Sequence, residues 1–479
     1  MKNKFYFFIK NNLSFIVLSL TITAVAAINS LNHIGLIEDG VHHFWEVLIS
    51  GNIWTGHEGF AHFPYNSRFF PSIISHLGTG LAIKAGVTNI PVLLYIFTFI
   101  SYISPLIFLA FVYFNLPKDK KNIFDLVLLS FLICMPFMIY QIWMENLNTA
   151  LFLWIIFAIY FCRDFNSLSL FNIFSVLLFS TALISSHPMT AVFAPFLLFI
   201  GIKKHIKTKY DAFLPKASVL LSFAALIFAF FFNVYYIVNP IFNSTGEYIH
   251  SGIFRSGTVI RLAVSLILVF FISAAKNSSF KNRIFLAVFI AACINIFDNF
   301  IFNIHSSDSY IYRTVGFYAV LLFMPLSVIF RNLKTHFIKT LNIVFMVVIV
   351  LNSMYYARIW QRYLQNTAAY LNETRFENIL YDSSLNIFTS QPVFFQVYHY
   401  HLHPFVLLLL PETFGVCADG KYKITVISQS QGLAGFYASK ITERKNILKK
   451  FSINTGENFK LYFKKGNDLI DFQSYKKSG

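Results

Sequence analysis

The chain has 479 residues, of which 56% are hydrophobic and only 12% are charged. This composition, with a mean hydropathy of +0.61, excludes a soluble globular protein and indicates a polytopic membrane protein. The formal net charge of +17 does not require a nucleic-acid partner, because much of it follows from membrane topology. Membrane lipids with anionic headgroups are the expected neighbours of these basic segments.

Apolar stretches recur along most of the chain. A hydrocarbon layer about 30 Å thick requires about 20 apolar residues per helix, and about eleven stretches meet or approach this length. We expect a mainly α-helical transmembrane bundle over residues 1–357. Its spans are residues 12–28, 92–114, 123–142, 146–162, 169–184, 188–202, 217–238, 258–275, 282–303, 311–331 and 337–357.

Basic residues occur in every second connection: near the N-terminus (Lys2, Lys4) and at residues 118–121, 203–216, 276–283 and 331–339. Lysine and arginine near helix ends favour the cytoplasmic side. The pattern therefore predicts a cytoplasmic N-terminus and, with an odd number of spans, an external C-terminal segment. The intervening connections, at residues 29–91, 143–146, 185–187, 239–257 and 304–310, are predicted to face outward.

The first apolar segment ends in Ala24-Val25-Ala26-Ala27, which is also typical of a signal-peptidase site. A retained anchor is the favoured interpretation, and cleavage would leave the orientation of the later spans unchanged. Three cysteines lie within spans or at their ends (Cys134, Cys162, Cys293), and Cys417 lies outside them. No intramolecular disulfide is expected in the exported parts.

The first external connection contains an acidic pair, Glu38 and Asp39, in a chain with only 21 acidic residues. Apolar residues at helical spacing then predict two short helices at the membrane surface, one over residues 40–50 and one from Pro71 to about Ala85. The first helix is marked by Val41, Phe44, Trp45 and Leu48, and the second by Ile73, Ile74, Leu77 and Leu81.

This connection also holds six of the chain's 14 histidines: His33, His42, His43, His57, His62 and His76. Their spacing matches no closed zinc site. Interfacial packing, hydrogen bonding to a polar ligand and metal binding are the alternative roles for them. His399, His401 and His403 would share one face if their segment is a strand. Within the bundle, His187, Asp298, Asn148, Asn233 and Asn295 are polar groups expected to face protein or a wet cavity, the asparagines as hydrogen-bonding contacts between helices.

The C-terminal segment, residues 358–479, is less hydrophobic and more charged. Alternating runs at 421–427 and 458–463 are typical of strands. We expect a small α/β or β-rich extracytoplasmic domain. The apolar run 405–410, between two prolines, is too short to span a membrane.

The external connection also carries an ordered series of short motifs: Glu38-Asp39-Gly40, Leu48-Ile49-Ser50-Gly51, Arg68-Phe69-Phe70-Pro71-Ser72 and residues 82–87. With the layout of residues 1–360, this series resembles the GT-C superfamily of integral membrane glycosyltransferases, which use polyprenyl-phosphate-linked sugars (arabinose and mannose transferases among them). Many members have Asp-Glu where this chain has Glu-Asp, and glycine follows Asp39 here.

The resemblance implies a prokaryotic inner-membrane enzyme that transfers a sugar, with inversion, to a glycan, lipid or protein acceptor outside the cytoplasm. Asp39, or its neighbour Glu38, is the expected general base, and Arg68 and Arg313 are the expected partners of the donor phosphate. Glu145 resembles a second acidic position that binds acceptor or metal. A divalent metal ion is the one cofactor left open. Further candidates for contact with substrate, acceptor or metal are His42, His43, His57, His62 and Asp298.

Each candidate also has a purely structural interpretation. Asp39 suits the N-cap of the helix at 40–50, Arg68 and Arg313 suit interfacial anchors, and Glu145 suits a solvated helix start. At the level of function, the alternatives are a transporter or lipid flippase, or a non-catalytic subunit of envelope polysaccharide assembly. The absence of a paired repeat in the sequence argues against a transporter.

Overall fold

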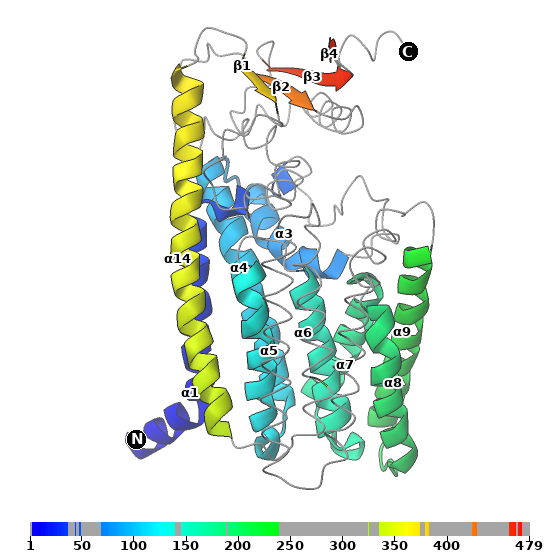
Figure 1. Ribbon diagram of the computed structural model, residues 1–479. Coiled ribbons are helices and arrows are strands. Elements are labelled where there is room, and N and C mark those ends of the chain that lie inside the picture. Colours follow the sequence, from blue (N-terminus) through cyan, green and yellow to red (C-terminus); the bar gives the residue numbers. More distant parts are fainter. Residues whose placement is uncertain are drawn as a thin grey trace.

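The computed structural model describes a helical bundle with a small sheet beyond one end (Figure 1). The described residues are 2–36, 44, 47–48, 69–138, 145–187, 190–238, 324, 335–373, 379–382, 424–428, 459–465 and 468–471. The statements below concern these residues.

The described part is mostly helical. The long elements are α1 (Lys2–Leu31), α3 (Phe69–Lys84), α4 (Ile90–Asn115), α5 (Asn122–Met138), α6 (Glu145–Phe157), α7 (Leu170–Ala182), α8 (Thr190–Lys207), α9 (Phe213–Val238) and α14 (Thr335–Glu373). A π-helical segment, η3 (Ala158–Cys162), continues α6. Short 3-10 helices are η1 (Ile34–Leu36), η2 (Lys118–Lys120), η4 (Phe165–Ser167) and η5 (Leu183–Ser185).

Three of these helices are long and apolar enough to cross a membrane, at Ile90–Asn115, Phe213–Tyr235 and Ile338–Arg362. Shorter apolar helices cover Phe15–Leu31, Asn122–Leu132, Leu147–Cys162 and Leu170–Ser185. The prediction of a helical membrane protein is confirmed at this level. The spans predicted at 258–275, 282–303 and 311–331 lie outside the described residues, apart from Met324, so the total of eleven stays a prediction.

The helices pack through aromatic side chains and leave other apolar side chains on the outside. Phe108 meets Phe152 edge-to-face at 4.7 Å between ring centroids, and Phe111 meets Phe179 at 5.0 Å. Such geometry is the preferred one for aromatic pairs. Large apolar side chains such as Phe231 remain 63% exposed. Apolar groups on both the inner and the outer faces are what lipid-facing helices require.

The basic connections lie together at one end of the bundle. The start of α1, η2, the α8–α9 turn and the start of α14 all lie at the lower end in Figure 1. We call this the basic end. It comprises residues 118–121, Arg163, residues 203–216 and Lys339. The end of α1 and the starts of α4, α6 and α8 lie at the other end, which we call the upper end.

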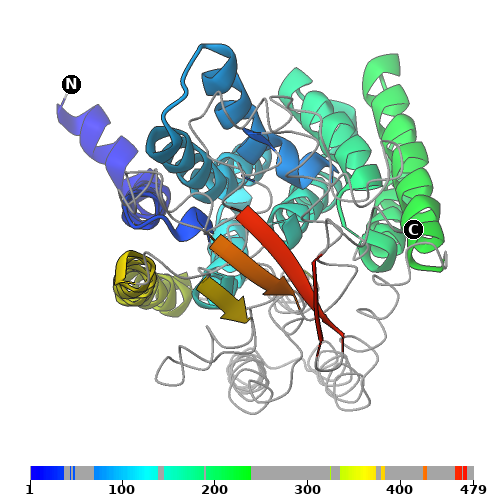
Figure 2. The same ribbon diagram turned by 90° about the horizontal axis from the view of Figure 1, so that it is seen from above.

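The four strands form one sheet in the order β1-β2-β3-β4, seen from above in Figure 2. The strands are β1 (Ile379–Asp382), β2 (Ile424–Ser428), β3 (Phe459–Lys465) and β4 (Asp468–Asp471). β1 pairs with β2 and β2 with β3 in parallel, whereas β3 and β4 are antiparallel. β2 and β3 coincide with the two alternating runs that predicted strands. His399, His401 and His403 lie outside the described residues.

Candidate functional site

Most residues assigned to the site from sequence lie outside the described part of the chain. These residues are Glu38, Asp39, His42, His43, His57, His62, Arg68, Asp298 and Arg313. Glu145 is the first residue of α6, so its backbone is at the upper end of the bundle. The elements that surround the predicted site are therefore described below, and the roles of these residues stay predictions.

Of the surface helix predicted over residues 40–50, the structure describes three residues. Phe44, Val47 and Leu48 are helical and at most 1% exposed. Phe44 packs on Phe97 of α4 with 5.5 Å between ring centroids. The residues that shortly follow the acidic pair are therefore fixed against the bundle.

The connection that leads to the acidic pair is held at the end of α1. His33 adopts a left-handed backbone conformation, with φ of 56°, which is a common way to end a helix. Its backbone N–H donates to the carbonyl oxygen of Ser30 at 3.2 Å. Its own carbonyl accepts a hydrogen bond from the indole Nε1 of Trp360 on α14 at 2.9 Å. Two helices far apart in sequence therefore fix the point from which residues 37–43 depart.

Helix α3 coincides with the second predicted surface helix, but its polar side faces inward. His76 and Thr79 are 2% and 0% exposed, whereas Leu77 and Leu81 of the predicted apolar stripe are 41% and 52% exposed. The His76 ring stacks on Phe97, with 6.4 Å between centroids. An outward apolar stripe suits a helix at the membrane surface. The inward face then presents a histidine and a hydroxyl to the upper end of the bundle.

Beneath α3 lies a group of buried hydroxyl and amide side chains that we call the polar layer. Helix α3 packs against α6 and η5 as well as α4, and α6 packs against α8. Helix α9 in turn packs against η5 and α8. The members of the polar layer come from α3, α6, the end of η5, α8 and α9, and each is at most 3% exposed: His76, Thr79, Asn148, Thr149, Ser185, Ser186, Thr190 and Asn233. Buried polar groups also occur near the basic end, where Asn172 donates to the side-chain oxygen of Asn115 at 2.8 Å. A cluster of buried polar groups at the upper end is a candidate binding site.

Hydrogen bonds satisfy only part of the polar layer. Asn233 donates to the carbonyl oxygens of Leu183 and Ile184, both at 3.3 Å, and of Ala229 at 2.8 Å. The contact between helices predicted for Asn233 is thereby confirmed. The hydroxyls of Thr79 and Thr190 have no hydrogen-bond partner within the described part of the chain. An unpaired buried hydroxyl costs about 1–3 kcal/mol, and such costs are commonly retained where a ligand supplies the partner.

Burial also disfavours the charged form of His33 and His76, the two histidines described at the upper end. Desolvation lowers the pKa of His76 to about 4, so its imidazole is neutral at pH 7. Burial lowers the pKa of His33 as well. A neutral imidazole both donates and accepts hydrogen bonds, as sugar hydroxyls do.

The basic end is built differently, because its cations bind the ends of helices. Arg163 donates from Nε to the carbonyl of Asn115 at 2.6 Å and from Nη2 to the carbonyl of Phe114 at 3.1 Å. Lys120 donates to the carbonyl of Cys162 at 3.0 Å, and Lys204 donates to the carbonyl of Arg163. Cations at helix C-termini satisfy free carbonyls and the helix dipole. These groups have a structural role and tie three basic turns together.

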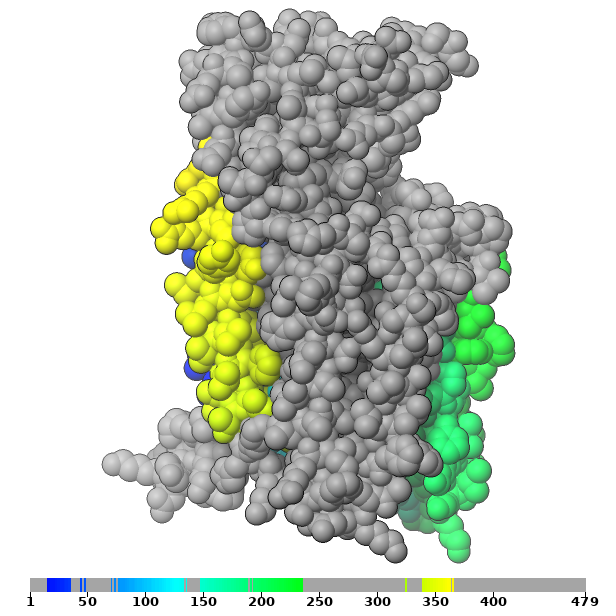
Figure 3. Space-filling view, viewed as in Figure 1, coloured from blue at the N-terminus to red at the C-terminus, as the bar shows by residue number. Residues whose placement is uncertain are grey.

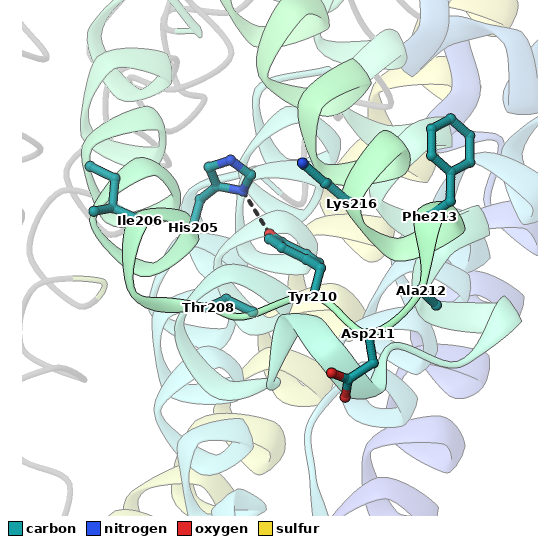
Figure 4. A pocket seen from close by; sticks show the side chains of 8 residues that line it. All are labelled: His205, Ile206, Thr208, Tyr210, Asp211, Ala212, Phe213 and Lys216. Carbon is teal, nitrogen blue, oxygen red and sulfur yellow. Dashed lines mark hydrogen bonds between the residues drawn. The ribbon is translucent and has the colours of Figure 1, made fainter.

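A surface pocket of about 530 Å³ lies at the α8–α9 turn of this end (Figure 4). His205 and Tyr210 are hydrogen-bonded across it at 2.7 Å, and Lys216 extends toward the His205 ring. Burial raises the pKa of Tyr210 to about 12. Asp211 is engaged by Asn166, whose side-chain oxygen accepts from the Asp211 N–H at 2.8 Å. One lysine and one imidazole suit weak anion binding on the basic side, away from the polar layer.

Metal ligands do not gather in the described part of the chain, where no group of three His, Cys, Asp or Glu side chains could hold a metal ion. Cys162 is buried and forms no disulfide within the described residues. Most of the histidines and acids of the predicted site lie outside this part, so metal binding by these residues stays a prediction.

The fold and these two ends define a helical membrane protein. No protein-family model, curated protein or solved structure matches the chain.

Two features of the structure were not expected from the sequence. One is the inward polar face of α3, for which the helical spacing of His76 and Thr79 was an available signal. The other is the polar extension of α14 beyond residue 357, which carries Arg358 and Arg362.

Proposed function

We propose that the protein is an integral membrane glycosyltransferase of the GT-C type. It transfers a sugar from a polyprenyl-phosphate donor to a glycan, lipid or protein acceptor at the upper end of the bundle. The basic end faces the cytoplasm of a prokaryotic cell, so the reaction takes place on the extracytoplasmic side of the inner membrane. The full bundle has eleven spans, and the C-terminal segment forms an external domain.

The observation that supports this proposal best is the place of the polar layer. It lies at the end opposite the basic turns, under α3, and the connection carrying Glu38 and Asp39 departs from the same end at His33. Positive charge at one end favours the cytoplasm for that end. Buried hydroxyls and amides at the other end offer the donors and acceptors that a sugar requires.

The chemistry assigned to the external connection is a single displacement. The Asp39 carboxylate removes the proton of the acceptor hydroxyl as its oxygen attacks the anomeric carbon. The bond from that carbon to the phosphate oxygen breaks, the configuration inverts, and the lipid phosphate departs with the bonding electrons. Arg68 and Arg313 compensate the charge of the phosphate. The polar layer holds the sugar, and the sheet domain docks the acceptor or a partner protein.

The test compares wild type with Asp39→Asn, purified in lipid and supplied with radiolabelled polyprenyl-phosphate sugars and envelope extract. Asp119→Asn is the matched control, because Asp119 is an exposed acid at the basic end. We expect transfer by wild type and control, and a loss of about 100-fold or more in Asp39→Asn, as is usual for a lost general base. Binding of donor should persist.

Other outcomes point to other functions. If Asp39→Asn retains full turnover, Asp39 is a helix cap, and Glu38 or Glu145 becomes the candidate base. If wild type transfers no sugar from a broad panel but moves labelled lipid across the bilayer of vesicles, the protein is a flippase and the transferase proposal fails.

A further inference from the structure

Helix α14 is longer than a membrane is thick, and its charged residues mark two levels. The helix has 39 residues. Near its start, Lys339 lies 4.0 Å from the carboxylate of Asp125 at the basic end. Arg358 follows 19 residues later, which at 1.5 Å per residue is a rise of about 28 Å. This rise matches the hydrocarbon thickness of about 30 Å, so Arg358 and Arg362 lie at the headgroup level of the opposite leaflet.

An exposed tyrosine supports this assignment of levels. Tyr355, three residues before Arg358, is 56% exposed, whereas Tyr356 and Trp360 are 7% and 0% exposed and pack inward. Tyrosine and tryptophan are enriched at the boundary between hydrocarbon and headgroups.

One stripe of α14 changes from apolar to polar at this level. Successive members are three or four residues apart and therefore share a face. Val344, Val347, Leu351 and Met354 are 51%, 54%, 61% and 55% exposed, and Arg358, Gln361 and Gln365 continue the same stripe. Figure 3 shows α14 running along the side of the molecule as open surface. The lower part of the stripe suits lipid tails, and the upper part suits a polar headgroup.

The polar part of the stripe borders a groove of about 470 Å³ between α14 and the end of α1. Arg358, Arg362, Gln361 and Gln365 line it from α14, and Asn32 lines it from the end of α1. Neither guanidinium has a hydrogen bond or ion pair within the described part of the chain. Two arginines one turn apart, with no counter-charge among the described residues, thus point to an anionic occupant.

We propose that this groove is a binding site for phosphatidylglycerol in the leaflet opposite the basic end. The two guanidinium groups bind the phosphate, since their planar donors match its oxygens. The amides of Gln361 and Gln365 bind the glycerol hydroxyls of the headgroup, together with the side-chain oxygen of Asn32, whose Nδ2 donates to the carbonyl of Ile28 at 2.6 Å. The acyl chains lie along the apolar part of the stripe. Phosphatidylethanolamine is disfavoured, because two arginines repel its ammonium group.

The groove should be more selective between headgroups than a single arginine that reaches the membrane interface. A single snorkelling arginine accepts any headgroup. Here two arginines and three amides converge on one concavity between two helices. The proposal therefore predicts selectivity between headgroups, and it does not depend on the transferase activity.

The test measures lipid retention by native mass spectrometry of protein taken from bilayers with equal phosphatidylglycerol and phosphatidylethanolamine. The variant Arg358→Gln/Arg362→Gln is compared with wild type and with Lys207→Gln/Lys209→Gln. The control removes the same charge from exposed positions at the basic end. We expect wild type and control to retain one phosphatidylglycerol, and the arginine variant to retain roughly tenfold less.

A second measurement guards against misfolding of the double variant. The midpoint of thermal unfolding is recorded without lipid and with added phosphatidylglycerol, and the single variant Arg362→Gln is included. Ligand that binds the folded state raises the midpoint, so wild type and control should rise more than either arginine variant. Equal retention of both lipids by wild type, an equal rise in all proteins, or preferential retention of polyprenyl phosphate would each overturn the proposal.

Discussion

Trp360 donates its indole N–H to the backbone carbonyl of His33 across 2.9 Å, and this bond joins α14 to the end of α1. Trp360 is 0% exposed, so its indole N–H is removed from water and depends on this carbonyl for a partner. His33 is the residue at which the chain leaves the bundle toward Glu38 and Asp39. The geometry of the predicted catalytic connection is thus tied to a helix more than 300 residues later in the chain.

Trp360→Phe should destabilise the protein more than Trp154→Phe. Both indoles are at most 1% exposed, so the loss of volume is similar. The Trp154 N–H has no partner within the described residues, whereas that of Trp360 is bonded. We expect an additional cost of about 1 kcal/mol at Trp360, measured by denaturant unfolding in detergent. An equal or greater loss at Trp154 would show that the bond contributes nothing.

Stability should fall between pH 6.5 and pH 4 through His76. Its pKa in the unfolded chain is 6.5, and burial lowers the pKa in the folded protein to about 4. Within this window the unfolded state binds more protons, so the free energy of unfolding decreases as pH falls, and the decrease ends near pH 4. The loss is at most about 3 kcal/mol.

His76→Gln is the variant that isolates this effect. Glutamine keeps a hydrogen-bonding group but does not titrate. The difference in unfolding free energy between wild type and His76→Gln should therefore change with pH across the window, to the disadvantage of wild type at low pH. A constant difference from pH 7.5 to pH 4.5 would contradict the assignment.

Thr79→Val should stabilise the protein and impair its function. The Thr79 hydroxyl is buried and has no partner within the described residues, so an isosteric methyl group removes a desolvation cost of about 1 kcal/mol. Thr98→Val is the control, because the Thr98 hydroxyl donates to the carbonyl of Leu94 at 2.8 Å. Thermal unfolding should shift upward for Thr79→Val only. A lower unfolding midpoint for Thr79→Val would show that the Thr79 hydroxyl stabilises the fold, and would contradict its assignment as an unpaired ligand-binding group.

Gly201→Ala should destabilise the contact of α8 with η3 and α9. An added Cβ would lie 2.5 Å from Cε1 of Phe223 and 2.9 Å from Cδ2 and Cε2 of Tyr160. Ordinary carbon contacts are about 3.5–4.0 Å. The Tyr160 hydroxyl is bonded to that of Ser222 at 2.6 Å, which restrains its ring. We expect a cost of about 1–3 kcal/mol, partly recovered in the double variant with Phe223→Leu. Additive effects of the two substitutions would exclude this contact as the cause.

The sequence was sufficient for the class of fold and for most helix positions. Apolar runs and the segregation of lysine and arginine placed α4 to α9, and the basic turns do gather at one end. Helix ends were less predictable, because hydropathy reports burial in lipid and not helical conformation. α1 begins at Lys2 and α14 continues to Glu373, through charged residues that keep good helix propensity.

The candidate site was less accessible to sequence analysis. The apolar stripe of α3 was recognisable, but periodicity alone does not say whether a stripe faces lipid or protein. The roles of Asp39, Arg68 and Arg313 came from a resemblance and stay predictions. The polar layer joins residues from α3, α6, η5, α8 and α9, a juxtaposition that depends on tertiary packing and has no signature in a single sequence.

The length of α14 has a mechanical consequence. Lys339 and Arg358 lie a fixed distance apart along the helix axis, and β1 begins at Ile379, shortly after the helix ends at Glu373. In a bilayer thinner than this distance, the helix tilts. We therefore expect bilayer thickness to be transmitted along α14 as a lateral shift of the first strand, so that lipid chain length alters the approach of the sheet to the bundle.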